Sequence, residues 1–316
     1  MIKPPRLRPG DTVGIVAPAS APAEPEAVDR AIATVRRLGF KPLLALNARE
    51  RLGYLAGTDA QRAQDLMSMF QNKNVRAIFC LRGGYGVSRL LSLLDYAFIR
   101  QHPKIVAGYS DITSLHCALQ KQAGIISFHA PMLGPDLSRS DLPVFTLTRF
   151  LRTLTQASPA GGISQGNEES PIKVISPGAS SGRLVGGNLT LLCGTLGTPY
   201  QPLVKKRILF LEEVDEAPYR VDRLLTQLLN AGLLQQVAGI AIGSMRGCSE
   251  PKARHSQGYR QTVEDVLKER LLPLQIPILS GMPFGHTVRN ATLPCGVRAT
   301  LDTTVPDLLI DEAAVR

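Results

Sequence analysis

The stretch VRAIFCLRGGYGVSRLLSLLDYAFIRQHPKIVAGYS, residues 75–110, indicates the fold class. Its two apolar runs, residues 75–81 and 104–109, are short and almost continuous, which is typical of strands that are buried on both faces. A helical pattern at residues 87–94 lies between them. A buried strand, a helix and a second buried strand form the unit from which parallel sheets are built.

The same alternation continues on both sides of this stretch. Strands are predicted at residues 12–17, 42–46 and 125–129, and helices at residues 26–38, 60–72, 111–122 and 143–155. We therefore expect a doubly wound α/β layer, with ligands at the carboxyl ends of its strands.

The second half of the chain has a more mixed pattern. Strands are predicted at residues 172–175, 207–211, 238–242 and 299–302, and helices at residues 188–196, 219–231 and 261–271. Residues 157–170 are rich in small and polar side chains, which indicates a linker. The 316 residues suggest two domains, and we place them at residues 1–156 and 171–316.

Composition and charge exclude several classes of protein. The net charge is +10, but the charges are dispersed, the chain has no tryptophan, and its aromatic and basic residues do not interleave, so we expect no nucleic-acid partner. No apolar run reaches the roughly 18–20 residues of a membrane helix, and we expect no membrane association. Five scattered cysteines without a C-x-x-C fit a reducing cytosol, so we expect a cytoplasmic protein without a metal or other cofactor.

Three segments that follow predicted strands carry candidate catalytic groups. Ser110 stands on a strand-to-helix turn, where a serine can be a nucleophile, although a helix N-cap is the commoner role. Glu212 opens an acidic turn whose alternative role is a solvated surface, and His286 lies in a Gly/Pro-rich loop, where a histidine is often only structural. Together they supply the nucleophile, acid and base of a triad.

Two glycine-rich turns accompany these segments. Gly83 and Gly84 follow the strand at residues 75–81, and consecutive glycines let backbone N–H groups converge on an anion. They are candidate oxyanion donors together with the backbone amide of Asp111; a tight turn or a phosphate cradle is the alternative. The turn that ends at Asn188 is similar, and its role is ambiguous.

The ordered set of motifs resembles the LD-carboxypeptidases, also called muramoyltetrapeptide carboxypeptidases, a family of serine peptidases. The motifs are RGGYG at residues 82–86, GYSD at 108–111, GGN at 186–188, LEE at 211–213 and PFGHT at 283–287. The resemblance covers almost the whole chain. It implies a flavodoxin-like N-terminal α/β domain, a smaller β-rich α+β C-terminal domain, a cytosolic homodimer and an active site between the domains.

The resemblance also implies roles and a reaction. Ser110 would be the nucleophile, Glu212 the acid and His286 the base. The substrate would be a murein tetrapeptide, cleaved at the bond between an L-configured centre and its terminal D-alanine during cell-wall recycling.

Three further residues are candidates for binding the substrate. Arg82, Tyr85 and Asn188 are the candidates. Arg82 could read the terminal carboxylate, with a surface salt bridge as its alternative role.

Two other functions remain open on the sequence. A related branch, the microcin self-immunity peptidases, would use the same triad on aminoacyl-nucleotide conjugates, and its site should offer an aromatic platform for the base. A non-catalytic binding module on an α/β scaffold would need no coupling between Ser110 and His286.

Overall fold

The computed structural model describes residues 1–164, 171–249 and 261–316. Its first sheet runs in the order β12-β5-β4-β3-β1-β2. Strands β1 to β5 are parallel and span Thr12–Val16, Lys41–Leu44, Val75–Cys80, Ile105–Gly108 and Ser127–His129. Their order, 2-1-3-4-5, is flavodoxin-like, so the predicted doubly wound parallel sheet is confirmed.

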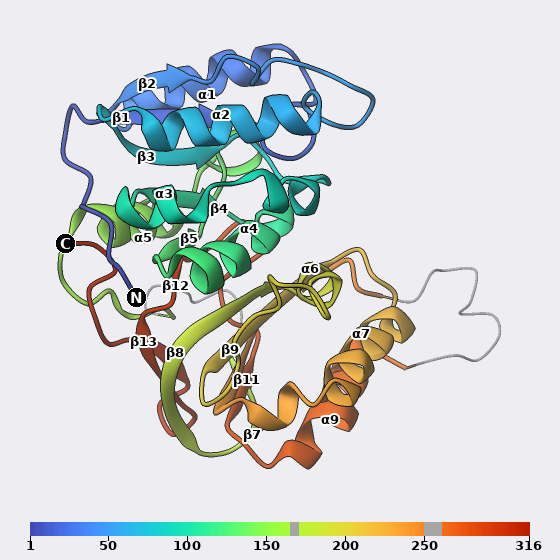
Figure 1. The fold of residues 1–316 in the computed structure, drawn as a ribbon. Helices are drawn as coiled ribbons and strands as arrows, with labels where there is room; N and C mark the ends of the chain where they lie inside the picture. Colours follow the sequence, from blue (N-terminus) through green and yellow to red (C-terminus); the bar gives the residue numbers. More distant parts are fainter. Residues whose placement is uncertain (165–170, 250–260) are drawn as a thin grey trace.

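Helices cover this sheet (Figure 1). They are α1 (Glu26–Arg37), α2 (Asp59–Gln71), α3 (Tyr96–Gln101), α4 (Thr113–Ala118) and α5 (Val144–Thr155). Helix α2 begins with the capping box that Thr58 and Gln61 form, in which each side chain accepts from the other residue's backbone N–H. Such caps fix where a helix starts, and so where the loop above the sheet must end.

The second sheet has the order β6-β14-β13-β8-β9-β10-β11-β7, and its central strands β8 to β11 are parallel. These elements span β6 Gly161–Gly162, β7 Lys173–Ser176, β8 Ala179–Asn188, β9 Ile208–Val214, β10 Gly239–Arg246, β11 Ile278–Ser280, β13 Arg298–Asp302 and β14 Asp307–Ile310. Helices α6 (Leu189–Gly194), α7 (Pro218–Asn230) and α9 (Val263–Leu271) pack beside it. This mixed layer agrees with the expected β-rich α+β second part.

The two halves of the chain are interlocked. Strand β12 (Leu293–Cys295) comes from the second half but pairs with β5 at the edge of the first sheet (Figure 1). The chain ends also meet, because Arg6 N donates to Arg316 O and Arg316 N donates to Pro4 O. The domain boundaries at residues 156 and 171 stay a prediction, and chain segments on either side of them share hydrogen bonds.

The predicted linker is partly wrong. Residues 161–162 form β6, which pairs with β14, and the side chain of Ile163 is buried in the core. A strand this short has no detectable period, so composition alone suggested a loop. Residues 165–170 of the predicted linker lie outside the described residues.

Two helix predictions in the first half need correction. Residues 87–94 form two 3₁₀ turns, Val87–Arg89 and Leu91–Leu93, and the helix α3 that follows was not predicted. The Asp95 side chain caps α3 by accepting from Phe98 N, which restarts the helix. Residues 111–122 divide into a 3₁₀ turn (Ser110–Ile112), α4 and a π-helical turn (Leu119–Ala123).

Candidate active site

Ser110 stands where β4 turns sharply into a helix. Its φ of 62° is left-handed, an uncommon conformation for a residue with a side chain. Gly108 makes the turn possible, because a Cβ there would lie 2.9 Å from Ile112 Cγ1 and 3.2 Å from Cys80 Cβ. A strained serine between a strand and a helix is the geometry of a nucleophile elbow.

The glycine turn after β3 faces this serine. A Cβ on Gly83 would lie 3.2 Å from Ser110 Oγ and 3.4 Å from the backbone N of Asp111. The amides of Gly83 and Gly84 have no hydrogen-bond acceptor within the described part of the chain. The loop after β1 holds this turn in place, because Tyr85 N donates to Ser20 Oγ at 3.1 Å. The predicted oxyanion donors are thus together beside the hydroxyl.

The carboxylate of Asp111 has a structural role inside the protein. Its Oδ2 accepts from Val87 N at 2.8 Å, and the side chain is buried. Burial raises the pKa of this carboxyl to about 6. Because its side chain points to the neighbouring turn, Asp111 contributes only its backbone N–H to the serine's surroundings.

Glu212 and His286 form a tight pair on the second half of the chain. His286 Nδ1 donates to Glu212 Oε2 at 2.6 Å, and His286 N lies 3.2 Å from the same oxygen. Burial alone would lower the pKa of His286, but the hydrogen bond and the charge of Glu212 raise it above the usual value. The bond fixes the tautomer, so Nε2 is the nitrogen free to accept a proton.

The loop that carries His286 is fitted closely to its neighbours. Gly285 has a φ of 93°, and a Cβ there would lie 2.6 Å from Glu212 Cβ. Ser244, at a bulge of β10, donates from its backbone N to Phe284 O at 2.9 Å and from Oγ to His286 O at 3.0 Å. Glycine permits the close approach, and Ser244 holds the loop there. The sequence analysis missed Ser244, since it carries no motif.

The neighbouring Glu213 has a different environment. It accepts hydrogen bonds from Asn188 Nδ2 at 2.7 Å, from Thr190 N and Oγ1, both at 2.8 Å, and from Val214 N at 3.0 Å. Burial raises the pKa of Glu213, and these donors partly oppose the shift. Glu212 and Glu213 therefore point to opposite faces of β9, the first toward His286 and the second toward α6.

Asn188, predicted to bind substrate, is buried and uses its side chain inside the protein. Its Oδ1 caps α6 by accepting from Leu191 N, and its Nδ2 holds Glu213. Its backbone N donates to Thr113 Oγ1 at 3.0 Å, which joins β8 to the helix behind Ser110. This geometry favours a structural role for Asn188.

Tyr109 packs between two histidines. Its ring centroid lies 4.9 Å from that of His286 and 5.7 Å from that of His129. Its hydroxyl donates to Asp136 Oδ1 at 3.3 Å, and burial raises the pKa of Asp136 to about 6. No motif pointed to Asp136, which lies in the π-helical turn Leu133–Leu137, where no element was predicted.

Ser110 and His286 meet at one cavity of about 390 Å³, and Glu212 is buried behind the imidazole. Ser110, His286, Arg82, Gly83 and Gly84 all line this cavity. Ser110 Oγ makes no hydrogen bond within the described residues, so the hydroxyl and the imidazole share the cavity without a direct bond. Catalytic contacts of this kind often tighten only when substrate is bound.

The two remaining predicted substrate residues are placed differently. Arg82 lines the cavity and donates from Nη1 to Ala21 O at 3.3 Å. Tyr85 lies outside the lining, half exposed, with its ring edge-on to Tyr54 at 5.7 Å. Of the two, only Arg82 is in a position to reach a ligand beside Ser110.

The described residues also limit which metal or membrane sites the chain can form. Across residues 1–164, 171–249 and 261–316, no three His, Cys, Asp or Glu side chains are grouped so that they could hold a metal ion. None of the described helices is both long enough and apolar enough to cross a membrane.

Comparison with known proteins gives consistent matches. Residues 13–130 match the N-terminal domain of LD-carboxypeptidase, and residues 181–301 match its C-terminal domain. The "Probable murein peptide carboxypeptidase" of Bacillus subtilis is 37% identical over 309 residues, covering 98% of this chain and 94% of that protein.

Solved structures agree over the full length. Muramoyltetrapeptide carboxypeptidase from Oxalobacter formigenes has a TM-score of 0.81 at 32% identity, covering 95% of this chain and 99% of the other. The microcin C7 self-immunity protein, in complex with aspartyl sulfamoyl adenosine, has a TM-score of 0.88 at 27% identity, covering 100% of both chains.

Proposed function

The chain belongs to the LD-carboxypeptidase family, and we propose that it is a serine peptidase that releases the terminal D-alanine from murein tetrapeptides. One observation carries the proposal. A strained serine, an imidazole held by a buried carboxylate, and amides without acceptors border the same cavity, although they come from distant parts of the chain. A binding module would need none of this coupling.

The geometry supports a definite order of steps. His286 Nε2 takes the proton of Ser110 as the hydroxyl attacks the scissile carbonyl carbon. The developing oxyanion accepts hydrogen bonds from the amides of Asp111 and the Gly83-Gly84 turn. Glu212 stabilises the imidazolium through Nδ1.

The intermediate then collapses. His286 gives its proton to the leaving nitrogen, D-alanine departs, and the peptide remains esterified to Ser110. A water, deprotonated by His286, attacks the ester, and the released Ser110 oxygen recovers the proton from the imidazolium. The proton that Ser110 loses leaves with D-alanine and is replaced by one from water, so the enzyme is regenerated and water is the only co-substrate.

We propose a murein peptide as the substrate because of the relatives' names, and the lining of the Ser110 cavity supports this choice. Both the Bacillus subtilis and the Oxalobacter formigenes relatives are named for murein peptides. The microcin self-immunity alternative needs a surface for a nucleobase. Tyr54 and Tyr85 form an aromatic pair, but they lie outside the lining of the Ser110 cavity. This placement favours the peptide substrate.

The test is incubation with L-Ala-D-Glu-meso-diaminopimelate-D-Ala, followed by mass detection of free D-alanine. We expect release by the native protein and a loss of roughly 10⁴–10⁶ in rate for Ser110→Ala, by analogy with other triads. Ser88→Ala is the matched control and should keep full activity, because Ser88 is exposed and lies outside the lining of the Ser110 cavity. Full activity in Ser110→Ala would refute the mechanism.

We propose in addition that the protein works in the cytoplasm as a homodimer. Five free cysteines, all of them buried, support a reducing compartment. Size-exclusion chromatography with light scattering tests the dimer, and a monomer at micromolar concentration would contradict it.

A further inference from the structure

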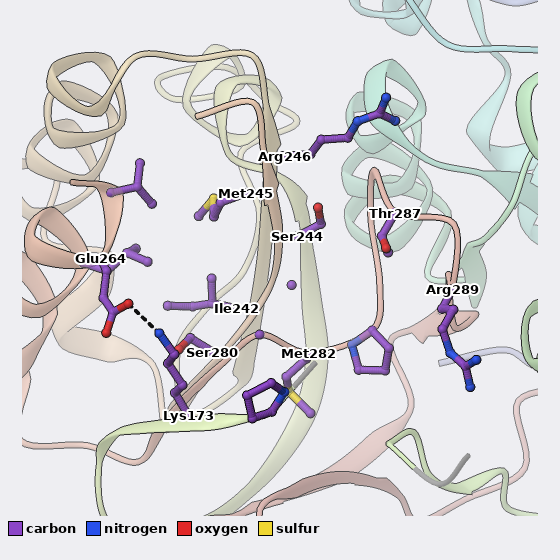
Figure 2. Close-up of a pocket in the computed structure, with 16 residues that line it drawn as sticks. Lys173, Ile242, Ser244, Met245, Arg246, Glu264, Ser280, Met282, Thr287 and Arg289 are labelled. Atoms are coloured by element: carbon purple, nitrogen blue, oxygen red, sulfur yellow. Dashed lines mark hydrogen bonds and ion pairs between the residues drawn. The ribbon is translucent and has the colours of Figure 1, made fainter. Parts of the chain in front are cut away.

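Arg246 stands at the carboxyl end of β10, on the sheet edge that also presents Glu212. Its backbone is fixed, because Asp215 N donates to Arg246 O at 2.8 Å. Its exposed guanidinium has no hydrogen-bond or ion-pair partner among the described residues. Figure 2 shows the side chain extending away from the Lys173–Glu264 ion pair, so the arginine is free to meet a ligand.

A second, smaller cavity of about 180 Å³ lies beside this arginine. Arg246, Arg139 and Asp136 line it, together with Tyr109, Pro135 and His286. The last three residues also line the larger cavity that contains Ser110. The two cavities therefore adjoin at the imidazole, with Ser110 on one side of it and Arg246 on the other.

The atoms of the scissile peptide bond must lie on different sides of the His286 imidazole. In the proposed reaction the carbonyl oxygen points to the Gly83 and Gly84 amides, while the leaving nitrogen must reach His286. In a terminal amino acid, only the α-carbon separates that nitrogen from the carboxylate. The carboxylate must therefore lie just past His286, in the smaller cavity that Arg246 lines.

We propose that Arg246 binds the C-terminal carboxylate of the substrate and so makes the enzyme a carboxypeptidase. This inference rests on the proposed function. A guanidinium matches a carboxylate with two parallel hydrogen bonds, which gives direction as well as charge.

The other arginines near the site are less suited. Arg139 already makes two hydrogen bonds to Asp141, at 2.9 and 2.6 Å. Arg82 lies on the oxyanion side, directly before Gly83, and donates to Ala21 O. The acidic Asp136 is engaged as well, because it accepts from Met132 N at 2.8 Å and from the Tyr109 hydroxyl.

The experiment compares two peptides that differ only at the end. One is the tetrapeptide acid, and the other carries D-alaninamide in place of D-alanine. Arg246→Gln should lower kcat/KM for the acid by roughly 10- to 100-fold, the range for a lost charged hydrogen bond, and leave the amide almost unchanged. Arg139→Gln and Arg82→Gln are the matched controls and should not alter the preference for the acid. Arg246→Lys should recover part of it.

Each contrary outcome has a distinct meaning. If Arg246→Gln slows both peptides equally, the residue is structural or reads the diaminopimelate carboxylate, and the inference is wrong. If Arg82→Gln abolishes the preference instead, the carboxylate is read on the oxyanion side, and the inference is again wrong. If the native protein releases nothing from either peptide, the proposed function fails, and the inference fails with it.

Discussion

At the scale of single residues, the paired glutamates of β9 show how position on a strand assigns a role. Glu212 contacts His286, whereas Glu213 receives four hydrogen bonds from the start of α6 and its own strand. Alternation of side chains along a strand sends adjacent residues to opposite faces. An acidic run in the sequence does not reveal this division, because it depends on which face the neighbouring strands cover.

Substitution should therefore separate the two glutamates. Glu212→Gln should lower kcat by about 10⁴, as loss of the triad acid does elsewhere, with little change in melting temperature. Glu213→Gln should lower stability by about 1–3 kcal/mol, since it leaves buried donors poorly matched, and should affect kcat far less. Kinetics and thermal melts on the same preparations measure both. The reverse pattern would mean that Glu213 is the acid.

The raised pKa of His286 predicts the pH dependence of the reaction. The base must be neutral to accept the Ser110 proton, so activity falls as pH drops through the pKa of His286. Because the hydrogen bond and charge of Glu212 raise that pKa above 6.5, the acid limb of kcat/KM should have its midpoint above 6.5. In Glu212→Gln the residual activity should show a lower midpoint. A native midpoint below 6.5 would contradict the pairing.

At the scale of elements, the strand patterns predicted the parallel α/β layer of the first sheet, while the edge strand β12 of that sheet and the strand β8 of the second were missed. Strands β1, β3 and β4 are apolar runs that are almost entirely buried, and burial on both faces of a sheet requires apolar residues at successive positions. Strand β8 contains Gly182, Gly186 and Gly187 and lacks that signal. A Cβ on Gly186 would overlap Phe210 O, so only a glycine at this position allows the backbone of β9 to pack so closely against β8. That requirement arises only in the folded chain.

The same strand docks onto the helix behind the nucleophile. Gly187 has a φ of 143°, and a Cβ there would overlap the Thr113 side chain at the start of α4. Gly187→Ala should lower the free energy of unfolding by about 1–3 kcal/mol and reduce activity by displacing α4. Gly194→Ala, where no atom lies within 4 Å, is the control and should be neutral. Equal melting temperatures for the two variants would disprove the docking role.

At the scale of the whole molecule, one core cluster extends across both sheets. It includes Val13 and Phe79 of the first sheet, Phe210 and Leu301 of the second, and Val315 near the C-terminus. Predicted domain limits follow from composition along the chain, and composition cannot reveal that β12 crosses back to β5 or that the two chain ends pair.

This interlocking predicts how the protein unfolds. The full chain should melt in a single transition with equal calorimetric and van't Hoff enthalpies. A fragment of residues 1–156 should show no cooperative transition, because it leaves the edge of β5 bare and lacks the buried Ala314 and Val315. Differential scanning calorimetry on both tests this. A fragment that melts sharply near the full-length temperature would show instead that the first half is autonomous.

The course of the chain around His286 has one more consequence. Residues 281–292, which carry His286, follow β11 of the second sheet and precede β12 of the first, so each end of this loop is attached to a different sheet. Because both sheets hold this loop, it cannot move as a rigid body with only one of them. Because both ends of this loop are held by sheets, the contact between the His286 imidazole and the Ser110 hydroxyl can tighten on substrate binding only through local movement of side chains or of the loop itself.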